Sequence, residues 1–554
     1  MERLSNPARR RLIDAQTRQM VDQYRDGGDS IDSLSRRYEV HRATVMQHRR
    51  TVLEVSDESV DSTHRKPLHI VGKGVLSAEP ALRLAGSGNR VSNSSAVGSF
   101  SIEGFGGTMM APDDVGYDDA RAVFNGMIDR RPAVIARCGE VSDVVAVVNF
   151  VRQNDLLLSV YGGGHGVTGS AVVDGGVCLD MRGMRNVVVD ADAATARVGG
   201  GATWGDVDAA TQQHGLAVTG GRVSMTGVAG LALGSGSGWL ERAFGFVCDN
   251  LVEAQVVTAD GCVVVASETE NADLFWGLRG GGGNFGVVTE FVFRLHPLGP
   301  IVLGGMLLFP AENAGDLVRF YRDFTANARD EVGSGLAFIT APPEEFVPEP
   351  VRGRPVVAIV CCYAGSVEDG EEAFRSLREL PYLGVDLVQP MPYVDVQQLL
   401  DAPNPKGMQN YWTADFFSEL PDEAIDTLVG LATKPVSPMT QLILVPGGGA
   451  IARVDEDAMA FGQRRAPFNM HYLSMWPDPT DTEKNIAYTR KIAAAMKPWT
   501  TGRAYLNFIG DEGTGRVEAA FGTDKYVRLT ELKHRWDPTN VFRHNQNIAP
   551  VRRL

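Results

Sequence analysis

The residues with the clearest chemical potential lie in Tyr161-Gly-Gly-Gly-His-Gly166, a glycine-rich loop that follows the strand-like residues 156–160. Glycines allow a backbone to turn tightly and to approach a ligand closely. Successive N–H groups in such a turn form a concave nest for an anion such as pyrophosphate. A second glycine-rich run extends from Gly227 to Gly238. His165 therefore stands in a predicted phosphate-binding loop, which is an unusual place for a core histidine.

A third segment, Gly281-Gly-Gly-Asn-Phe-Gly286, formally matches the G-x-G-x-x-G pattern of nicotinamide-binding folds. That pattern binds a dinucleotide when it follows a strand and opens a helix. Here the order is reversed, because helix-like residues 273–278 precede the glycines and strand-like residues 287–295 follow them. The segment is not predicted to be a Rossmann fingerprint.

The elements that must position these loops alternate between strands and helices over residues 118–299. Apolar residues at helical spacing mark 141–153 and 204–214, and Gly215 ends the second helix. Residues 251–259 and 262–266 form a predicted hairpin around Asp260-Gly261, a favoured two-residue turn. Residues 300–500 mix strand-like runs (356–363, 442–445) with helices (371–380, 482–496), and 524–535 is a predicted last helix. We expect an α+β protein whose later part is an antiparallel sheet covered by helices.

The composition argues against a membrane-spanning protein, a disulfide-rich secreted protein and a metal-binding protein. The chain has 554 residues, no apolar run of the ~20 residues that cross a bilayer, and no visible signal peptide. Six cysteines lack disulfide-framework spacing, which favours a reducing cytoplasm, and the ten histidines show no metal-ligand spacing. We expect a cytoplasmic protein without a metal.

The first 50 residues carry a net charge of +4 and the other 504 carry −19. Residues 1–52 are predicted to be a small all-helical head that resembles a resolvase-type helix-turn-helix. In that motif the last helix enters the DNA major groove, which would present Arg42, Thr44, Gln47 and Arg49. A solvated basic hairpin without a DNA role is the alternative. Residues 53–104 are predicted to be a flexible linker, because they are rich in Ser, Gly and Asn.

The motifs, in order, resemble the FAD-linked oxidoreductases of the vanillyl-alcohol oxidase type, in the berberine-bridge-enzyme-like branch. The resemblance covers residues 105–551. The matching text is Arg131-Pro-Ala-Val-Ile-Ala136, Gly162-Gly-Gly-His-Gly166, the run 227–238, Cys248-Asp-Asn-Leu251, Val257-Thr-Ala-Asp-Gly261, residues 275–286 and Trp536-Asp-Pro-Thr-Asn-Val-Phe-Arg-His-Asn-Gln-Asn-Ile548.

The resemblance implies a two-subdomain PCMH-type FAD-binding domain (105–299), a substrate domain (300–504) and a berberine-bridge-like segment (505–554) that returns to the first domain. It also implies FAD as cofactor. The implied cofactor-binding residues are Gly162, Gly163, Gly164, His165, Gly166, Gly169, Gly227, Gly230, Gly234, Gly236, Gly238, Asn284, Gly286, Val287, Asn545 and Asn547.

His165 matches the family histidine that is attached covalently to the flavin, with a non-covalent contact or a structural histidine as alternatives. Many relatives add a second link through cysteine, but Val223 occupies that place here. One covalent bond is therefore expected. Thr226 matches a position that in plant relatives gates oxygen; its modest size favours an oxidase, although its methyl group could simply pack under the ring.

Tyr505-Leu-Asn-Phe508 matches the family's Tyr-x-Asn-aromatic strand beside the substrate. Alternation would place Tyr505 and Asn507 on one face. Tyr505 could act as general base if a cation such as Arg503 lowered its pKa from ~10. Many relatives carry a second tyrosine where this chain has Phe508, and a structural role for Tyr505 stays open. His471 is a further candidate substrate contact.

The motifs and the resemblance together predict an FAD-dependent oxidase that takes hydride from a CH–OH group of a sugar or secondary metabolite, with O2 as acceptor. A dehydrogenase with another acceptor is the first alternative. A DNA-binding regulator that senses redox through its flavin is the second, and it depends on the basic head alone.

Overall fold

The computed structural model describes residues 101–344, 347–510 and 512–551. The predicted helix-turn-helix head and almost all of the linker lie outside the described residues. Those that are described fall within one compact unit. In this part of the chain no helix is both long and apolar enough to cross a membrane.

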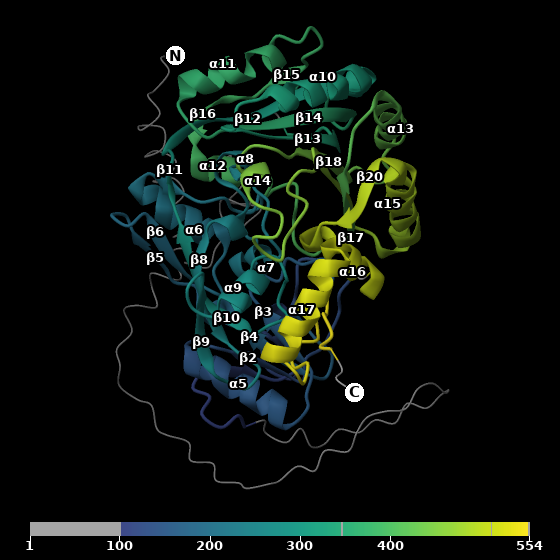
Figure 1. Cartoon of the computed structure of the whole chain (residues 1–554). Helices are drawn as coiled ribbons and strands as arrows, with labels where there is room; N and C mark the ends of the chain where they lie inside the picture. Colours follow the sequence, from purple (N-terminus) through teal and green to yellow (C-terminus); the bar gives the residue numbers. More distant parts are fainter. Residues whose placement is uncertain (1–100, 345–346, 511, 552–554) are drawn as a thin grey trace, which may run out of the picture. The chain divides into compact units, whose positions relative to one another are not determined.

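Two sheets build the first half of the described chain (Figure 1). The four-stranded sheet has the order β1-β2-β4-β3, with β1 (Thr108–Met110), β2 (Val134–Arg137), β3 (Leu158–Tyr161) and β4 (Val177–Asp180). The five-stranded sheet has the order β5-β6-β10-β8-β9, with β5 (Val187–Asp190), β6 (Thr195–Gly199), β8 (Leu251–Val257), β9 (Val263–Ser267) and β10 (Val287–Arg294). A short pair joins β7 (Leu216–Ala217) to β11 (His296–Pro297).

The helices of this half begin or end where short sequence signals such as caps and glycines occur. They are α4 (Tyr117–Arg121), α5 (Val141–Gln153), α6 (Trp204–Thr211), α7 (Val228–Leu233), α8 (Glu241–Phe244) and α9 (Ala272–Leu278). Helix α5 is confirmed at its predicted bounds, and a capping box between Glu140 and Asp143 begins it. Helix α6 continues as a 3-10 turn to His214 and ends at Gly215, whose φ is 64°. The hairpin is also confirmed, but its connection is longer than predicted, because pairing stops at Val257 and Val263.

A nine-stranded antiparallel sheet forms the second half, in the order β15-β12-β14-β13-β18-β19-β17-β20 with β16 paired to β12. Its strands are β12 (Ile301–Pro310), β13 (Val332–Thr340), β14 (Pro355–Tyr363), β15 (Val385–Asp386), β16 (Gln389–Pro392), β17 (Gln409–Phe417), β18 (Gln441–Pro446), β19 (Phe468–Trp476) and β20 (Thr500–Ala504). The helices here are α10 (Ala314–Asn327), α11 (Val367–Arg378), α12 (Tyr393–Gln397), α13 (Asp422–Ala432), α14 (Ala450–Arg453) and α15 (Thr482–Met496). Helices α10, α11, α13 and α15 cover the sheet (Figure 1), so the predicted α+β architecture is confirmed.

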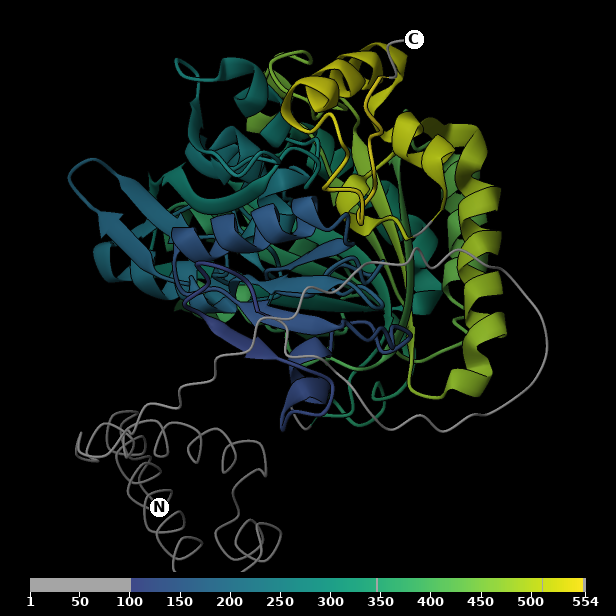
Figure 2. The ribbon, with the colours of Figure 1, turned by 90° about the horizontal axis from the view of Figure 1, so that it is seen from below.

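The chain ends with α16 (Thr514–Phe521) and α17 (Thr523–Trp536). Helix α17 packs on α9, so the C-terminal segment returns to the first half of the described chain (Figures 1 and 2). This return brings residues 540–548 beside the glycine-rich segment that precedes β10.

Candidate functional site

The loop after β3 touches the turn before α7, backbone against backbone. A Cβ atom added to Gly163 would lie 2.3 Å from the backbone nitrogen of Gly227, and the reverse contact is equally close. Real Cβ atoms do not approach that closely, so both positions require glycine. The two glycine-rich runs of the sequence therefore meet at this contact.

This loop carries unpaired backbone donors. Among the described residues, no protein acceptor receives a hydrogen bond from the N–H groups of Gly163, Gly164, His165 or Gly166. Almost all buried backbone N–H groups in proteins are paired, so the free N–H of the buried Gly164 calls for a ligand. Gly163 and His165 are partly buried and Gly166 is exposed, so their N–H groups are accessible to the same ligand. Free N–H groups in a tight turn form a nest for an anion.

A cavity of about 320 Å³ opens beside the loop. The glycine loops, one face of the large sheet and the C-terminal segment line it. Eleven of the predicted cofactor contacts are lining residues: Gly162, Gly163, Gly164, His165, Gly166, Gly227, Gly230, Gly234, Gly286, Val287 and Asn545. The structure therefore brings together residues that span nearly four hundred positions of the sequence.

Five predicted contacts do not line the cavity: Gly169, Gly236, Gly238, Asn284 and Asn547. Close packing explains two of these glycines. A Cβ on Gly236 would lie 2.4 Å from the side chain of Val247. A Cβ on Gly238 would lie 2.0 Å from the carbonyl oxygen of Gly220. Gly236 and Gly238 are therefore small because neighbouring protein atoms pack against them, and not because a ligand lies next to them.

His165 lies in the cavity wall with its imidazole held by aromatic rings. Phe124 stacks on it, with ring centroids 4.0 Å apart, and Trp412 lies at 6.3 Å. Its Nε2 is buried without a hydrogen-bond partner in the described chain. Burial lowers the pKa of His165 to about 4, so the ring is neutral near pH 7. A neutral imidazole with a free nitrogen is a competent nucleophile.

The cavity fits a flavin dinucleotide on two observations. A Cβ added to Gly166 or Gly230, both lining residues, would meet no atom within 4 Å, so these glycines leave space that a ligand can fill. The free N–H nest supplies the anion site that a pyrophosphate needs. A metal finds no such support, since the described residues contain no cluster of three or more His, Cys, Asp or Glu that could hold one.

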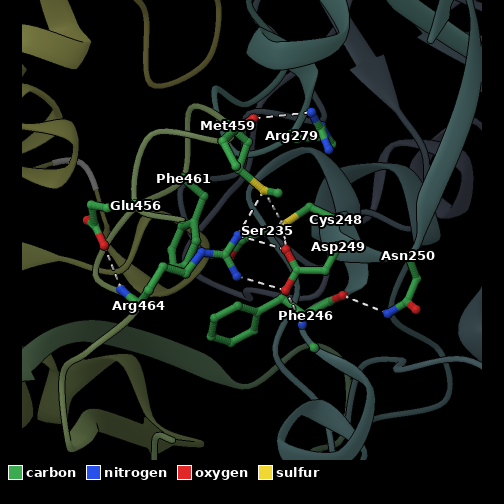
Figure 3. A network of polar contacts seen from close by, with 12 residues as sticks. Ser235, Phe246, Cys248, Asp249, Asn250, Arg279, Glu456, Met459, Phe461 and Arg464 are labelled. Atoms are coloured by element: carbon green, nitrogen blue, oxygen red, sulfur yellow. Dashed lines mark hydrogen bonds and ion pairs between the residues drawn. The ribbon is translucent and has the colours of Figure 1, made fainter. Parts of the chain in front are cut away.

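The place of the second family link is occupied by Val223, which lines the cavity. No cysteine is among the described residues that line the cavity. Cys248 instead lies in the polar network of Figure 3, where its sulfur is 3.5 Å from that of Met459. Burial raises the pKa of the Cys248 thiol, so it is not a ready nucleophile.

The same network ties the two halves of the chain together. The guanidinium of Arg464 donates two hydrogen bonds of 2.7 Å to the carboxylate of Asp249 (Figure 3), and both side chains are buried. The carboxylate also accepts the N–H of Phe246 at 2.8 Å. A bidentate pair fixes the relative orientation of its two side chains. It therefore holds the segment before β8 and the loop before β19 at a fixed position relative to each other.

One face of strands β17, β18 and β19 forms the far wall of the cavity. Side chains two residues apart point to the same face of a strand. The lining residues follow that rule: Trp412 on β17, Gln441, Ile443 and Val445 on β18, and His471 and Leu473 on β19. His471 pairs with Ile443 across the sheet. The wall is largely apolar, with a few polar groups.

Two expectations for Tyr505 are wrong. Strand β20 ends at Ala504, and residues 506–508 form a 3-10 turn instead of continuing the strand. Arg503 does not lower the tyrosine's pKa, which burial raises to about 12. Tyr505 is fully buried behind the cavity wall, with its hydroxyl 3.4 Å from that of Ser235.

Asn507 and Thr226, the other two predicted catalytic positions, do line the cavity. The amide of Asn507 donates a 3.0 Å hydrogen bond to the carbonyl oxygen of Leu231. A Cβ on Gly234 would lie 1.7 Å from the Asn507 side-chain oxygen, so any larger residue there would displace the Asn507 side chain. Asn507 therefore links the C-terminal segment to α7.

Asn284 fixes the C-terminal segment instead of facing the cavity. Its side-chain oxygen accepts the N–H of Ile548 at 2.9 Å, and its amide donates to the carbonyl oxygen of Gly281 at 2.9 Å. Lys533 donates to the Asn284 carbonyl oxygen at 2.7 Å. Asn545 lines the cavity and its amide donates to the carbonyl oxygen of Gly283 at 2.9 Å, while the Asn547 side-chain oxygen is buried without a partner in the described chain.

Sequence reasoning missed Arg222. It lines the cavity beside Val223 and donates hydrogen bonds to Ser237 at 2.8 Å and to Glu241 at 3.1 Å. Its guanidinium also lies over the ring of Trp239, 4.8 Å from the centroid. In the sequence, the position of Arg222 directly before Val223 was the signal that could have marked it as a cavity residue. Its partners lie some 15 to 19 positions further along the chain, so its contacts could not be read from local sequence.

A buried acid behind the cavity predicts a pH effect on stability. Asp208 accepts a 3.1 Å hydrogen bond from Gln397, which also donates to the Gly221 carbonyl oxygen. Burial raises the pKa of Asp208 to about 7 from 3.8. The folded state thus holds a proton that the unfolded chain has lost between pH 4 and pH 7. Its contribution to the free energy of unfolding should fall with rising pH across this window, by up to ~1.4 kcal/mol per pH unit.

Urea unfolding of wild type and Asp208→Asn at several pH values measures this contribution. We expect the difference in free energy of unfolding to grow in favour of the variant from pH 4 to pH 7 and then level off. Parallel curves for the two proteins would contradict a raised pKa at Asp208.

Known proteins share both the sequence and the architecture of this chain. A family described as "FAD binding domain" matches residues 132–267, and one described as "Berberine and berberine like" matches residues 504–549. (R)-6-hydroxynicotine oxidase of Paenarthrobacter nicotinovorans is 30% identical over 80% of this chain and 97% of its own length.

Two solved structures illustrate the shared fold. 6-hydroxy-D-nicotine oxidase from Arthrobacter nicotinovorans has a TM-score of 0.71 and 30% identity, covering 81% of this chain and 98% of its own. Xylooligosaccharide oxidase from Myceliophthora thermophila, solved with xylobiose, has a TM-score of 0.72 and 22% identity, over 81% and 98% of the two chains. Matching sequence, fold and cavity lead to one assignment: this chain is an FAD-linked oxidoreductase of the vanillyl-alcohol oxidase type and belongs to the berberine-bridge-enzyme-like branch.

Proposed function

We propose that the protein is an oxidase that carries its flavin on a single covalent bond to His165. The observation that carries this proposal is the neutral imidazole of the partly buried His165, whose enclosed Nε2 has no partner in the described chain, inside a loop of unpaired N–H groups. The remaining lining glycines and Asn545 would hold the cofactor by backbone and amide contacts. When bound, the flavin supplies the two-electron redox chemistry.

The substrate we propose is a small molecule with a CH–OH group, such as a sugar or a secondary metabolite. The relative solved with xylobiose is a sugar oxidase, whereas the nicotine oxidase acts on a different class of compound. The apolar wall of β17–β19 offers a packing surface. Gln441 and His471 on this wall, and Asn404 in the segment before β17, add polar groups to the cavity lining.

Flavin attachment and substrate class are tested separately. Purified protein that stays yellow after acid precipitation would support covalent flavin, and colourless protein would overturn the proposed function. A screen of alcohols, sugars and amines that detects hydrogen peroxide would then identify the substrate class. Loss of substrate-dependent flavin bleaching under all conditions would also contradict an oxidoreductase role for this cavity.

Thr226→Leu is expected to slow reoxidation by O2 while leaving substrate reduction nearly unchanged. Thr226 lines the cavity, so we expect a larger side chain at this position to occupy part of the open space. We expect a drop on the order of tenfold in the reoxidation rate, or ~1.4 kcal/mol in its barrier. Anaerobic and aerobic stopped-flow absorbance measure the two half-reactions separately.

Thr226→Val is the matched control, because it removes the hydroxyl group at nearly constant volume and should keep the wild-type reoxidation rate. If reduction falls and reoxidation does not, Thr226 contacts the substrate instead. If O2 never reoxidises the wild type, the protein is a dehydrogenase with another acceptor.

A further inference from the structure

His471 is a buried polar side chain that faces the cavity without a partner. It lies on β19, is 2% exposed and is a lining residue. Within the described chain neither ring nitrogen makes a hydrogen bond, and Nε2 is fully enclosed. Buried polar groups are nearly always hydrogen-bonded, so an exception calls for a ligand or another explanation.

Aromatic packing fixes the plane of this imidazole. Phe508 stacks on it at 4.0 Å between ring centroids, and Tyr505 lies nearly parallel at 5.9 Å. The strand register adds a second constraint, since His471 pairs with Ala414 on β17 and with Ile443 on β18. The ring is therefore held in one orientation before any ligand binds.

The imidazole is in its neutral form. Burial, with a smaller contribution from the positive charge of Arg222, holds the pKa of His471 well below its usual range. A neutral imidazole has one N–H donor and one nitrogen lone pair. The lone pair can accept a proton from a hydroxyl group.

No other lining side chain suits this task. Among the described lining residues there is no Asp, Glu, Lys or Tyr. His165 is assigned to the flavin, and His544 already contacts the carbonyl oxygen of Val172 at 2.9 Å. Tyr505 lies behind the wall, so it does not reach the reacting atoms directly.

The lining residues also favour an uncharged substrate over a cationic one. A cationic amine would enter a cavity without a lining carboxylate and with Arg222 as its charged wall residue. Desolvating a charge without a partner is costly. A neutral hydroxyl compound meets no such penalty.

We propose that His471 is the catalytic residue that accepts the hydroxyl proton of a neutral alcohol substrate. This inference depends on the proposed function, which supplies the oxidised flavin. The substrate O–H bond breaks and its proton forms an N–H bond on the imidazole. The hydrogen on carbon would leave with the C–H bonding pair as hydride, for which the bound oxidised flavin would be the two-electron acceptor, and the O–H bonding pair becomes the second C–O bond. The alcohol is thereby oxidised by two electrons to a carbonyl compound.

The test uses flavin-loaded full-length protein and the neutral alcohol that wild type oxidises fastest in the peroxide screen. Anaerobic stopped-flow bleaching should be slower in His471→Gln on the order of 10²–10⁴-fold, the usual contribution of a general base. His471→Ala should be similarly slow and should regain rate with added imidazole, which a merely structural role would not produce. Calorimetry with dithionite-reduced enzyme should show alcohol binding by His471→Gln within about tenfold of wild type, because the amide still hydrogen-bonds.

Tyr472→Phe is the matched control. It changes the neighbouring residue on the opposite face of β19, where Tyr472 packs in the core beneath the covering helices, and should bleach like wild type. Bleaching of His471→Gln within threefold of wild type, or absence of imidazole rescue in His471→Ala, would overturn the role of His471 and leave the oxidase proposal standing. Bleaching of wild type by amines but by no neutral alcohol would overturn the substrate class.

Discussion

His165→Ala should abolish covalent flavin completely while retaining some bound cofactor. The substitution removes the imidazole that is proposed to carry the flavin. No second link is expected, because Val223 stands in the place of the family cysteine and no cysteine is among the described residues that line the cavity. The unpaired N–H groups of Gly163, Gly164 and Gly166 remain and can still bind a pyrophosphate. Mass spectrometry of the denatured protein measures the adduct, and absorbance of the native protein measures total flavin.

His544→Ala is the control for this experiment, because His544 also lines the cavity but already contacts Val172 and Arg130. It should keep a full adduct. Proteolysis of the wild type should yield a single flavopeptide, and that peptide should contain His165. A flavin-sized adduct on His165→Ala, or a modified cysteine in the wild type, would show that the attachment site is elsewhere.

Lys533→Met should lower the free energy of unfolding by about 3–5 kcal/mol, the usual cost of removing one member of a buried ion pair. Lys533 and Asp537 are fully buried and 2.7 Å apart. The ammonium group also donates to the carbonyl oxygens of Asn284 and Phe542. Methionine leaves the Asp537 carboxylate without a cation and releases both carbonyl contacts. Chemical denaturation followed by circular dichroism measures the loss, and flavin retention should fall with it.

Arg535→Met on the same helix is the control. Arg535 pairs with Asp273 at 2.7 Å, but two thirds of its side chain is exposed. Surface ion pairs contribute about 0–1 kcal/mol, so this variant should unfold close to wild type. If the two variants lost the same free energy of unfolding, burial would not make the Lys533–Asp537 pair more important for stability than the exposed pair.

In the C-terminal region, the local sequence pattern predicts one element correctly and another one wrongly. The helix predicted at 524–535 is present as α17, because its apolar spacing and the following Asp537-Pro538 are local signals. The strand predicted through Tyr505 is wrong, because the 3-10 turn is set by packing of Asn507 against Gly234 and α7. A strand-like pattern contains no information about a partner more than two hundred residues away.

The sequence by itself determined the loop chemistry: the histidine among glycines, the missing cysteine at Val223, the helix bounds of α5 and the order of family motifs. These depend on residue type and short spacing, which the chain carries locally. Only the tertiary structure decided that Gly163 meets Gly227, that Asn284 anchors the C-terminal segment, and that Tyr505 is buried while His471 faces the cavity beside Arg222. The orientation of His471 follows from strand register, because a shift of one residue along β19 would turn its side chain to the opposite face. The other outcomes follow from close approach between segments that are far apart in the sequence.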